Sequence, residues 1–404
     1  MSTRTDLITD LDAFAALEGE WNSLLEASAA DTVFLTHEWM FRWWKYFGMG
    51  RLLQLVTVRQ DGELIAIAPL MRTPAKLQPF RPLSALEFLG FDHVTSDYLD
   101  IIVRRGRETA AREALVAYFA SRRKTLDLVQ IDEAGSEAGV ICERLGALSR
   151  RPFTLRKTSM SVSRVIALSG LTWDGYLGTL GSSHRYNVRR RRRNLAKQFE
   201  VQIDVVKDES QRQAALADLV QLHNMRWQGR GEKGAFSTAD ILQFHDEVSK
   251  KFLALGWLRL FILRMNGTPA AAFYGFRYKG TYSFYQHGLD PQHSKLSVGQ
   301  VLLGMSIEYA IEEGADVYDF LSGENTYKDL WAKDNRSLIQ IEACPAGWPA
   351  AVRVTTEMAR QAKRRLMKLA GRKPVTVEYA PAAGDDAEAA PPADLANATR
   401  KGAM

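Results

Sequence analysis

The stretch LRLFILRMNGTPAAAFYGF, residues 258–276, consists of two apolar runs around Asn266-Gly267. Asn-Gly suits a two-residue type I′ turn, so the stretch predicts a β-hairpin. LLQLVTVRQDGELIAIAPLM, residues 52–71, repeats this form around an Asp-Gly pair. Two such hairpins, one in each half of the chain, indicate an internal repeat. Hairpins of this type are common, so a chance match is the alternative.

The segments that follow each hairpin extend the repeat. In both halves the pattern predicts a strand, a helix and a second strand after the hairpin. These segments are 97–103, 107–122 and 125–131 in the first half, and 281–290, 298–313 and 315–321 in the second. A hairpin joined to a strand–helix–strand crossover predicts an α/β fold of mixed sheets with helices on both faces. We expect two domains, residues 1–155 and 156–348.

The composition changes after Pro345. VRVTTEMARQAKRRLMKLAGRK, residues 352–373, is basic with interleaved apolar residues and predicts a helix within 349–374. Residues 375–404 are rich in Ala, Pro and Asp and contain almost no large apolar residue, so we expect a disordered tail. A basic amphipathic helix can lie on an anionic membrane surface. Peripheral contact with the inner membrane through this helix is therefore one interpretation, and a solvated helix packed on the second domain is another.

The composition also excludes several classes of protein. The 404 residues include 53 Lys and Arg and 47 Asp and Glu, a near balance that argues against a general nucleic-acid binder. The two cysteines, Cys142 and Cys344, give neither a disulfide framework nor a Cys-based metal site. The sequence has no GxxxxGKS/T, GxSxG, HExxH or CxxC motif, so we expect neither covalent nor metal catalysis. Its apolar runs are too short to cross a bilayer, and we expect a soluble cytoplasmic protein.

The stretch SSHRYNVRRRRRNLAK, residues 182–197, contains six arginines and one lysine. As a helix it would place Arg185, Arg189 and Arg193 on one face, and it would bury an apolar stripe on another. Guanidinium groups pair with phosphate oxygens, often through two hydrogen bonds. These arginines are therefore candidate substrate-binding residues for an anion. A solvated helix face without a ligand is the alternative.

The stretch GLDPQHSKLSVGQVLL, residues 288–303, leads from a strand through a polar loop into a helix. The first amides of a helix have no intrahelical acceptor, so this turn is a candidate phosphate site. Its residues are Ser297, Val298, Gly299 and Gln300. Gly299 would allow a ligand to approach the backbone closely. An ordinary strand-to-helix loop fits the same pattern.

The segment DFLSGENTYKDLW, residues 319–331, follows the end of a predicted strand. Strand ends beside a crossover are where such sheets bind ligands. Asp319 could accept a proton there, Tyr327 could donate one, and Lys328 supplies a positive charge for a phosphate or an oxyanion. His287, at the end of the preceding strand, is a second candidate base. The alternatives are that Tyr327 packs in a helix and that His287 is structural.

The stretch HNMRWQGRGEKGAF, residues 223–236, combines polar, aromatic and glycine residues. This composition predicts a loop that closes over a substrate. Arg226 and Trp227 are its candidate substrate-binding residues. A Trp227 that only caps the core is the alternative.

Five segments together resemble the tandem GNAT-like acyltransferases of bacterial exopolysaccharide synthesis, of the CelD/BcsL type. The segments are SSHRYNVRRRRRNL, HNMRW, NGTPAAAFYGF, LDPQHSKLSVGQVLL and YDFLSGENTYKDLW, and the resemblance covers roughly residues 10–345. The group includes holdfast-polysaccharide acetyltransferases and is distantly similar to the FemAB/FemX peptidoglycan aminoacyltransferases. The resemblance implies two tandem GNAT-like acyltransferase domains. It also implies acetyl-CoA between splayed central strands, with its pyrophosphate on the amides near Ser297–Gln300.

The resemblance further implies a GNAT-type N-acetyltransferase that moves acetyl from acetyl-CoA to an amine or hydroxyl of an exopolysaccharide precursor. Its expected partners are nucleotide- or lipid-linked sugars or polysaccharide precursors, whose diphosphate, like a CoA phosphate, could meet the arginines of residues 182–197. The sequence departs from the Q/RxxGxG/A signature of GNAT enzymes, because Gly299 is the only glycine between Gln292 and Gln300. One alternative is a FemX-type transferase with aminoacyl-tRNA as donor. Another is a catalytically weak scaffold that binds c-di-GMP through the arginines of residues 352–373.

Overall fold

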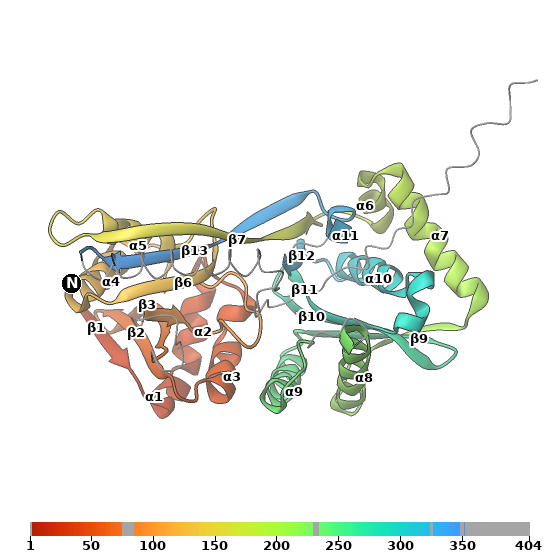
Figure 1. Ribbon diagram of the computed structural model, residues 1–404, viewed down its shortest axis with the longest axis horizontal. Coiled ribbons are helices and arrows are strands. Elements are labelled where there is room, and N and C mark those ends of the chain that lie inside the picture. Colours follow the sequence, from red (N-terminus) through yellow and green to blue (C-terminus); the bar gives the residue numbers. More distant parts are fainter. Residues whose placement is uncertain (1, 75–84, 229–233, 324–325, 348–350, 352–404) are drawn as a thin grey trace, which may run out of the picture.

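The computed structural model describes residues 2–74, 85–228, 234–323, 326–347 and 351 of the chain. Apart from Ala351, the basic helix predicted at 349–374 and the tail predicted at 375–404 lie outside the described residues. Figure 1 shows the described chain as a long sheet with helices on both faces. This is the mixed α/β architecture that the sequence predicts.

The N-terminal half places helices on both faces of one end of the sheet. Its strands are β1 (Thr3–Ile8), β2 (Leu52–Gln60), β3 (Glu63–Arg72), β4 (Ala85–Phe88), β5 (Ile102–Val103) and β6 (Thr125–Asp132). Its helices are α1 (Leu11–Ala16), α2 (Glu18–Glu26), α3 (His37–Phe47), α4 (Glu108–Arg122) and α5 (Glu137–Gly146), with a short 3-10 helix η1 at Val33–Leu35.

The C-terminal half forms the other end of the sheet. Its strands are β8 (Val201–Val205), β9 (Leu258–Met265), β10 (Thr268–Tyr278), β11 (Thr281–Leu289) and β12 (Val317–Ser322). Its helices are α6 (Trp173–Thr179), α7 (Ser182–Gln198), α8 (Glu209–Gln228), α9 (Ala239–Ala254), α10 (Val298–Glu312) and α11 (Thr326–Asp329), with a 3-10 helix η3 at Pro291–Leu296.

One 13-stranded sheet runs through both halves of the described chain. Its order is β1-β2-β3-β4-β6-β13-β7-β12-β11-β10-β9-β8, with β5 beside β3. The long strands β7 (Phe153–Ala167) and β13 (Asp334–Pro345) pair antiparallel in the middle. β13 also pairs with β6, and β7 also pairs with β12. These two strands therefore connect the halves through continuous backbone hydrogen bonds. The division into domains 1–155 and 156–348 stays a prediction.

Both predicted hairpins are confirmed. β2 pairs antiparallel with β3, and β9 pairs antiparallel with β10. The φ angles are 50° at Asp61 and 91° at Gly62 in the first turn, and 50° at Asn266 and 80° at Gly267 in the second. Positive φ at both central residues is the type I′ geometry, which matches the right-handed twist of the paired strands.

The strand–helix–strand order is confirmed after the second hairpin, where β11, α10 and β12 occupy the predicted segments. After the first hairpin the structure corrects it, because the parallel partner of β6 is β4 and not the strand predicted at 97–103. In that segment only Ile102–Val103 form a strand, which pairs antiparallel with β3. Tyr98 has a φ of 57°, a left-handed conformation that interrupts an extended strand.

The two halves share a hydrophobic core on one face of the sheet. The buried Trp39 ring of α3 lies 5.0 Å from the Phe244 ring of α9 and 5.6 Å from the Tyr285 ring of β11, between centroids. Lys45 and Glu247 add an ion pair between the same two helices at 2.6 Å. Figure 1 shows α2, α3, α8 and α9 on this face, and α4, α5 and α10 on the other. Aromatic rings bury large apolar areas, so this packing holds the halves in one arrangement.

Candidate active site

The parallel strands β11 and β12 pair only along their first residues. Thr281–Ser283 face Val317–Asp319, and the pairing ends there. Further along, β11 stays paired with β10 as far as Leu289, whereas β12 is joined to β7 through Ser322. The two strands therefore separate toward their C-terminal ends in the middle of the sheet. A ligand can use strand edges that lack a neighbouring strand, and strand ends in α/β sheets are common ligand sites.

The helix α10 follows β11 and begins at the predicted phosphate-binding residues. Ser297 has a φ of 54°, and its carbonyl accepts the first intrahelical hydrogen bond from the Val301 amide at 3.1 Å. The amides of Val298, Gly299 and Gln300 precede that bond and have no intrahelical acceptor in helix geometry. The helix dipole favours a negative charge at this end. The binding of a donor phosphate by these four residues stays a prediction.

The side chains of this first turn serve packing. Val298 is 1% exposed. Gln300 Oε1 accepts a hydrogen bond from the Trp331 indole at 2.9 Å, which ties α10 to the chain after α11. A Cβ at Gly299 would lie 3.3 Å from the Leu289 side chain, so the glycine keeps α10 close to the end of β11. The backbone, and not these side chains, is the available binding group.

Asp319 lies on β12 at the point where the strands separate, and it is 1% exposed. Its Oδ1 accepts hydrogen bonds from Ser163 Oγ at 2.6 Å and from the Leu321 amide at 2.7 Å. Its Oδ2 accepts from the Tyr98 hydroxyl at 2.7 Å. Burial, together with the nearby Asp319, raises the pKa of Tyr98, which keeps that phenol protonated as a donor. Donors from both halves of the chain therefore fix the orientation of this carboxylate.

Two buried charges hold the end of β12. The Lys328 ammonium, 2% exposed, donates to the carbonyls of the last three residues of β12 at 3.1, 3.3 and 3.4 Å. Burial lowers the pKa of Lys328 to about 8, against the attraction of Asp97 and Asp319. Asp97, which is fully buried, accepts from the Ser322 amide at 2.6 Å. Burial raises the pKa of Asp97 to about 6, against the effect of the Ser322 amide.

His287 lies on β11 beyond the point of separation. Its Nε2 accepts a hydrogen bond from the Arg226 guanidinium. A guanidinium can only donate, so Nε2 of His287 carries no proton in this geometry. The His287 carbonyl accepts from Nδ1 of His223 at 2.9 Å, and Nε2 of His223 accepts from the Ala235 amide at 3.0 Å. Burial lowers the pKa of His223 to about 4, so that ring is neutral and connects α8 to β11.

The structure corrects the prediction of a closing loop at residues 223–236 for its first six residues. His223–Gln228 form the last turns of α8, and residues 229–233 lie outside the described residues. Arg226 and Trp227 are 4% and 2% exposed, as expected for side chains on the inner face of a helix. The glycines that suggested a loop all follow Gln228, which is why the composition was misleading for the residues before them.

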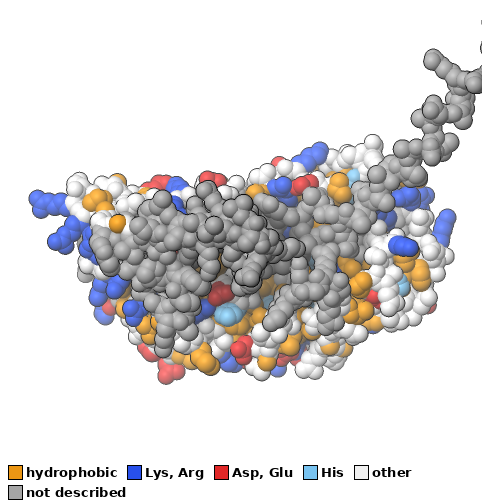
Figure 2. Space-filling view, in the orientation of Figure 1, with side chains coloured by type: hydrophobic (Ala, Val, Ile, Leu, Met, Phe, Trp, Pro, Cys, Tyr) orange, Lys and Arg blue, Asp and Glu red, His pale blue; other side chains and the backbone are white. Residues whose placement is uncertain are grey.

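The arginine-rich stretch forms the predicted helix α7. Arg189 makes an exposed ion pair with Asp174 at 2.8 Å. Figure 1 places α7 at the outer end of the C-terminal half, and Figure 2 shows Lys and Arg side chains at both ends of the molecule. The first turn of α7 contacts the chain after α11, because the His184 and Trp331 rings lie 4.7 Å apart between centroids. Anion binding stays a prediction for Arg185, Arg189 and Arg193.

The other predicted residues lie around that separation. His287 is on β11, Asp319 on β12, and Tyr327 and Lys328 on α11. Tyr327 is 7% exposed and belongs to the apolar cluster that α10 also joins. The catalytic roles of these four residues stay predictions. Sequence reasoning missed Asp97, Tyr98 and Ser163, because a contact such as Tyr98–Asp319 joins residues 221 positions apart and leaves no local pattern.

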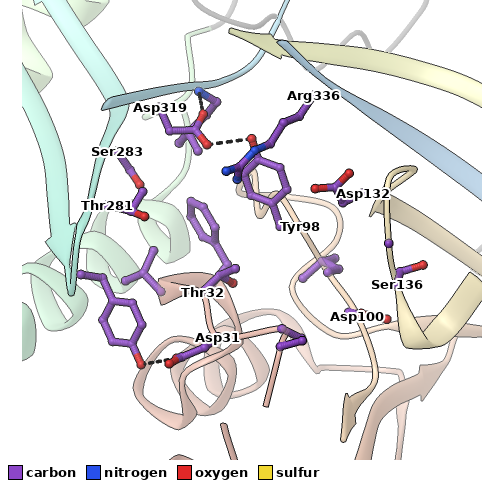
Figure 3. A pocket seen from close by; sticks show the side chains of 18 residues that line it. Asp31, Thr32, Tyr98, Asp100, Asp132, Ser136, Thr281, Ser283, Asp319 and Arg336 are labelled. Carbon is purple, nitrogen blue, oxygen red and sulfur yellow. Dashed lines mark hydrogen bonds between the residues drawn. The ribbon is translucent and has the colours of Figure 1, made fainter. Parts of the chain in front are cut away.

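A cavity of about 200 Å³ lies between the two halves, beside Asp319 (Figure 3). Residues just before and within η1 form one part of its wall, and the loop around Tyr98 and the end of β6 form another. Thr281 and Ser283 of β11 close it from the C-terminal half. The cavity therefore meets β11 and β12 at the last residues that pair.

Two general features are absent from the described residues. There, no three His, Cys, Asp or Glu side chains form a group that could hold a metal ion. No helix in the same part of the chain is both long and apolar enough to cross a membrane.

Comparisons with known proteins agree with this geometry. Residues 182–329 match the family described as “Acetyltransferase (GNAT) domain”. The structure of FemX is similar with a TM-score of 0.57 and 12% identity, covering 83% of this chain and 96% of that one. A conserved protein of unknown function from Bacteroides thetaiotaomicron is similar with a TM-score of 0.54 and 10% identity, covering 84% of this chain and 100% of that one. No curated protein sequence shows a significant match.

The match at residues 182–329 includes α7, α10, the separation of β11 and β12, and Asp319, Tyr327 and Lys328. The solved structures have low sequence identity to this chain, so they show similarity of the fold alone. That similarity extends over both halves of the chain. The protein is therefore an acyltransferase with the GNAT fold.

Proposed function

We propose that this protein transfers an acetyl group from acetyl-CoA to an amine or hydroxyl of an exopolysaccharide precursor sugar. The observation that carries the proposal is the separation of β11 and β12 beside the first turn of α10. It lies inside the residues that match the GNAT acetyltransferase domain. The exopolysaccharide acceptor rests on the resemblance of the sequence segments to the CelD/BcsL type.

The donor would use backbone groups more than side chains. The amides of Val298, Gly299 and Gln300 supply donors for the pyrophosphate of acetyl-CoA. The edge of β11 that no longer faces β12 supplies amides and carbonyls for the pantetheine arm and the thioester. Donors fixed in a folded backbone stabilise developing negative charge without reorganising, which is how such an edge would accelerate acyl transfer.

The transfer itself needs a proton acceptor and a proton donor. The acceptor nitrogen or oxygen attacks the thioester carbonyl carbon and loses a proton to Asp319 or His287. The tetrahedral intermediate then collapses, the C–S bond breaks, and Tyr327 protonates the departing thiolate. Lys328 places a positive charge near the end of β12, which opposes the negative charge of the intermediate. The separation of β11 and β12 lies among these groups.

The hydrogen bonds in the structure favour Asp319 over His287 as the base. Nε2 of His287 is already bound to the Arg226 guanidinium, which would have to move before that nitrogen could take a proton. Asp319 is held by three donors and faces the cavity between the halves. A carboxylate with two oxygens offers about four acceptor positions, so one remains for an acceptor group.

The test is release of CoA thiol from acetyl-CoA, measured with UDP-glucosamine as an amine acceptor and UDP-glucose as a hydroxyl acceptor. We expect turnover with at least one of them. We also expect losses of about 10²–10⁴-fold for removal of an acid or base group, here in Asp319→Asn and Tyr327→Phe. If Asp319→Asn, Tyr327→Phe, Lys328→Ala and His287→Ala all folded and kept wild-type turnover, these roles would be abandoned.

The second candidate is aminoacyl transfer, favoured by the similarity of the fold to FemX over both halves of the chain. The donor would then be an aminoacyl-tRNA ester instead of a thioester. The same acceptors would separate the two activities. Turnover with alanyl-tRNA and none with acetyl-CoA would replace the acetyl proposal by this one. Absence of binding to either donor would favour a scaffold.

A further inference from the structure

The cavity between the halves has a wall rich in hydroxyl groups. Ser283 is 5% exposed and lines the cavity. Thr32 Oγ1, which also lies at this cavity, is buried without a partner among the described residues. Figure 3 shows Thr281 and Ser283 on the β11 side of the cavity, with Tyr98 and Asp132 across from them. A buried hydroxyl without a partner is costly, so a ligand in this cavity would gain by bonding to it.

The charged groups of the wall are mostly acidic. The cavity is lined by Asp31, Asp100, Asp132 and Asp319, and by one arginine, Arg336. The Arg336 guanidinium lies over the Tyr98 ring, 5.6 Å from its centroid. Burial raises the pKa of Asp100 to about 7, so this group carries only part of a negative charge at neutral pH. The other carboxylates still outnumber the arginine, and such an excess repels a diphosphate and attracts an ammonium group.

The four carboxylates differ in the number of hydrogen-bond donors from which each of them accepts. Asp100 accepts from the amides of Ile101, Glu137 and Ala138, and Asp31 is paired with Lys279 and the Tyr278 hydroxyl. Asp132, at the end of β6, accepts only from the Ala134 amide among the described residues, at 3.0 Å. Asp132 therefore has the most acceptor positions left for a ligand, and Asp319, which accepts from three donors, has about one.

Aromatic rings complete the lining. Phe34, Tyr98 and Tyr278 all contribute to the cavity wall. Carboxylates and hydroxyls can form hydrogen bonds to the hydroxyl groups of a ligand, and aromatic rings can pack against its C–H groups. A wall with both kinds of group suits a polyhydroxylated ring. Many ligand sites combine such an apolar wall with a few converging polar groups.

The cavity is placed for acyl transfer. Ser283 and Asp319 are opposite each other in the last pair of β11 and β12, and both line the cavity. A ligand bound there therefore reaches the point where the strands begin to separate, which is where the proposed function places the thioester. The wall comes from both halves, so the N-terminal half takes part in recognition.

We propose that this cavity is the acceptor subsite and that it takes the amine-bearing ring of an amino sugar. Hydroxyls of the ring bond to Ser283, Thr32 and Asp132, and the amine faces Asp319. A diphosphate on the same acceptor would remain outside the cavity. The proposal rests on the proposed function, because it assigns the acceptor of that reaction.

The test is calorimetric titration of the full chain with D-glucosamine, D-glucose and cyclohexylamine. The first has both hydroxyls and an amine, and the others have one kind of group each. We expect D-glucosamine to bind at least about tenfold more tightly than either of the others, since a site built to hydrogen-bond a ligand discriminates against analogues without the bonding groups. Equal affinity for all three, or binding of none, would overturn the proposal.

Two variants locate the site. Ser283→Leu fills the cavity from β11, and Asp132→Lys reverses the charge at its N-terminal wall; each is expected to weaken D-glucosamine binding by about tenfold or more. Glu113→Lys, on the exposed face of α4, makes the same change of charge elsewhere and should leave the affinity unchanged. If Ser283→Leu does not fold, the comparison of D-glucosamine affinity between Asp132→Lys and Glu113→Lys tests the location of the site. Unchanged affinity in Asp132→Lys would overturn the assignment.

Titration of the wild-type chain with acetyl-CoA separates this inference from the proposed function. Binding of acetyl-CoA without binding of D-glucosamine would remove the subsite and leave the acetyltransferase proposal intact. Binding of D-glucosamine that depends on Asp132, without binding of acetyl-CoA, would leave a sugar site in a protein with another donor.

Discussion

Replacing Asp97 by asparagine should make the protein more stable at neutral pH. The Asp97 side chain is fully buried, and one of its oxygens has no hydrogen-bond partner among the described residues. Its other oxygen accepts from the Ser322 amide, a bond that the carbonyl of an asparagine can keep. The variant therefore preserves the shape and this bond, and it removes the cost of a buried negative charge.

The size of the effect follows from the pKa of Asp97, which burial raises from 3.8 to about 6. Between these two pH values the folded protein keeps a proton that the unfolded chain releases, so stability falls as pH rises through this window. One pKa unit corresponds to about 1.4 kcal/mol, so the wild type should lose about 3 kcal/mol from this group between pH 3.8 and pH 7. The attraction of Lys328 is already contained in that pKa.

The assay is urea unfolding of wild type and Asp97→Asn, followed by tryptophan fluorescence at pH 4 and pH 7. The difference between the free energies of unfolding of the two proteins at each pH removes the contributions of all other titrating groups. We expect nearly equal free energies of unfolding at pH 4 and an advantage of about 3 kcal/mol for the variant at pH 7. A difference that is the same at both pH values, or a wild type that is the more stable at pH 7, would refute the reasoning.

Two further changes test contacts described above. Tyr98→Phe removes a buried donor to Asp319 and should lower the free energy of unfolding by about 1–3 kcal/mol and reduce turnover. Urea unfolding measures the stability and release of CoA thiol measures the turnover. An unchanged free energy of unfolding would show that this hydrogen bond contributes nothing to stability. Gly288→Ala would place a Cβ 2.7 Å from the His223 amide nitrogen in α8. It should cost about 1–3 kcal/mol, whereas Gly178→Ala, with open space around it in α6, should gain about 0.5–1 kcal/mol. Equal melting temperatures for these two variants would contradict the close approach of α8 to β11.

The parts of the fold that were predicted correctly depend on local sequence. Asn266-Gly267 specifies its turn because few residues tolerate positive φ at both positions, and the alternating apolar runs beside it specify strands. The helix α10 and the strand β12 follow from apolar runs of the right length and from the glycine at residue 314 that separates them. Local physical chemistry decides these elements before any tertiary contact forms.

The parts that were missed depend on contacts distant in sequence. Residues 97–101 look like a strand because Leu99 and Ile101 are apolar, but the left-handed Tyr98 and its bond to Asp319 decide their conformation. The sequence does indicate Asp319 and Lys328 as residues at a strand end. It cannot indicate that the N-terminal half supplies their partners, because side-chain hydrogen bonds between halves impose no periodicity on either segment.

The most direct measurement is calorimetric titration of the full chain with acetyl-CoA. A thioester held between β11 and β12, with its pyrophosphate on the first turn of α10, predicts saturable binding of one molecule per chain. The dissociation constant should lie between about 1 μM and 1 mM, the range in which enzymes usually bind their substrates. No heat of binding at millimolar acetyl-CoA would contradict the placement of the donor at this separation.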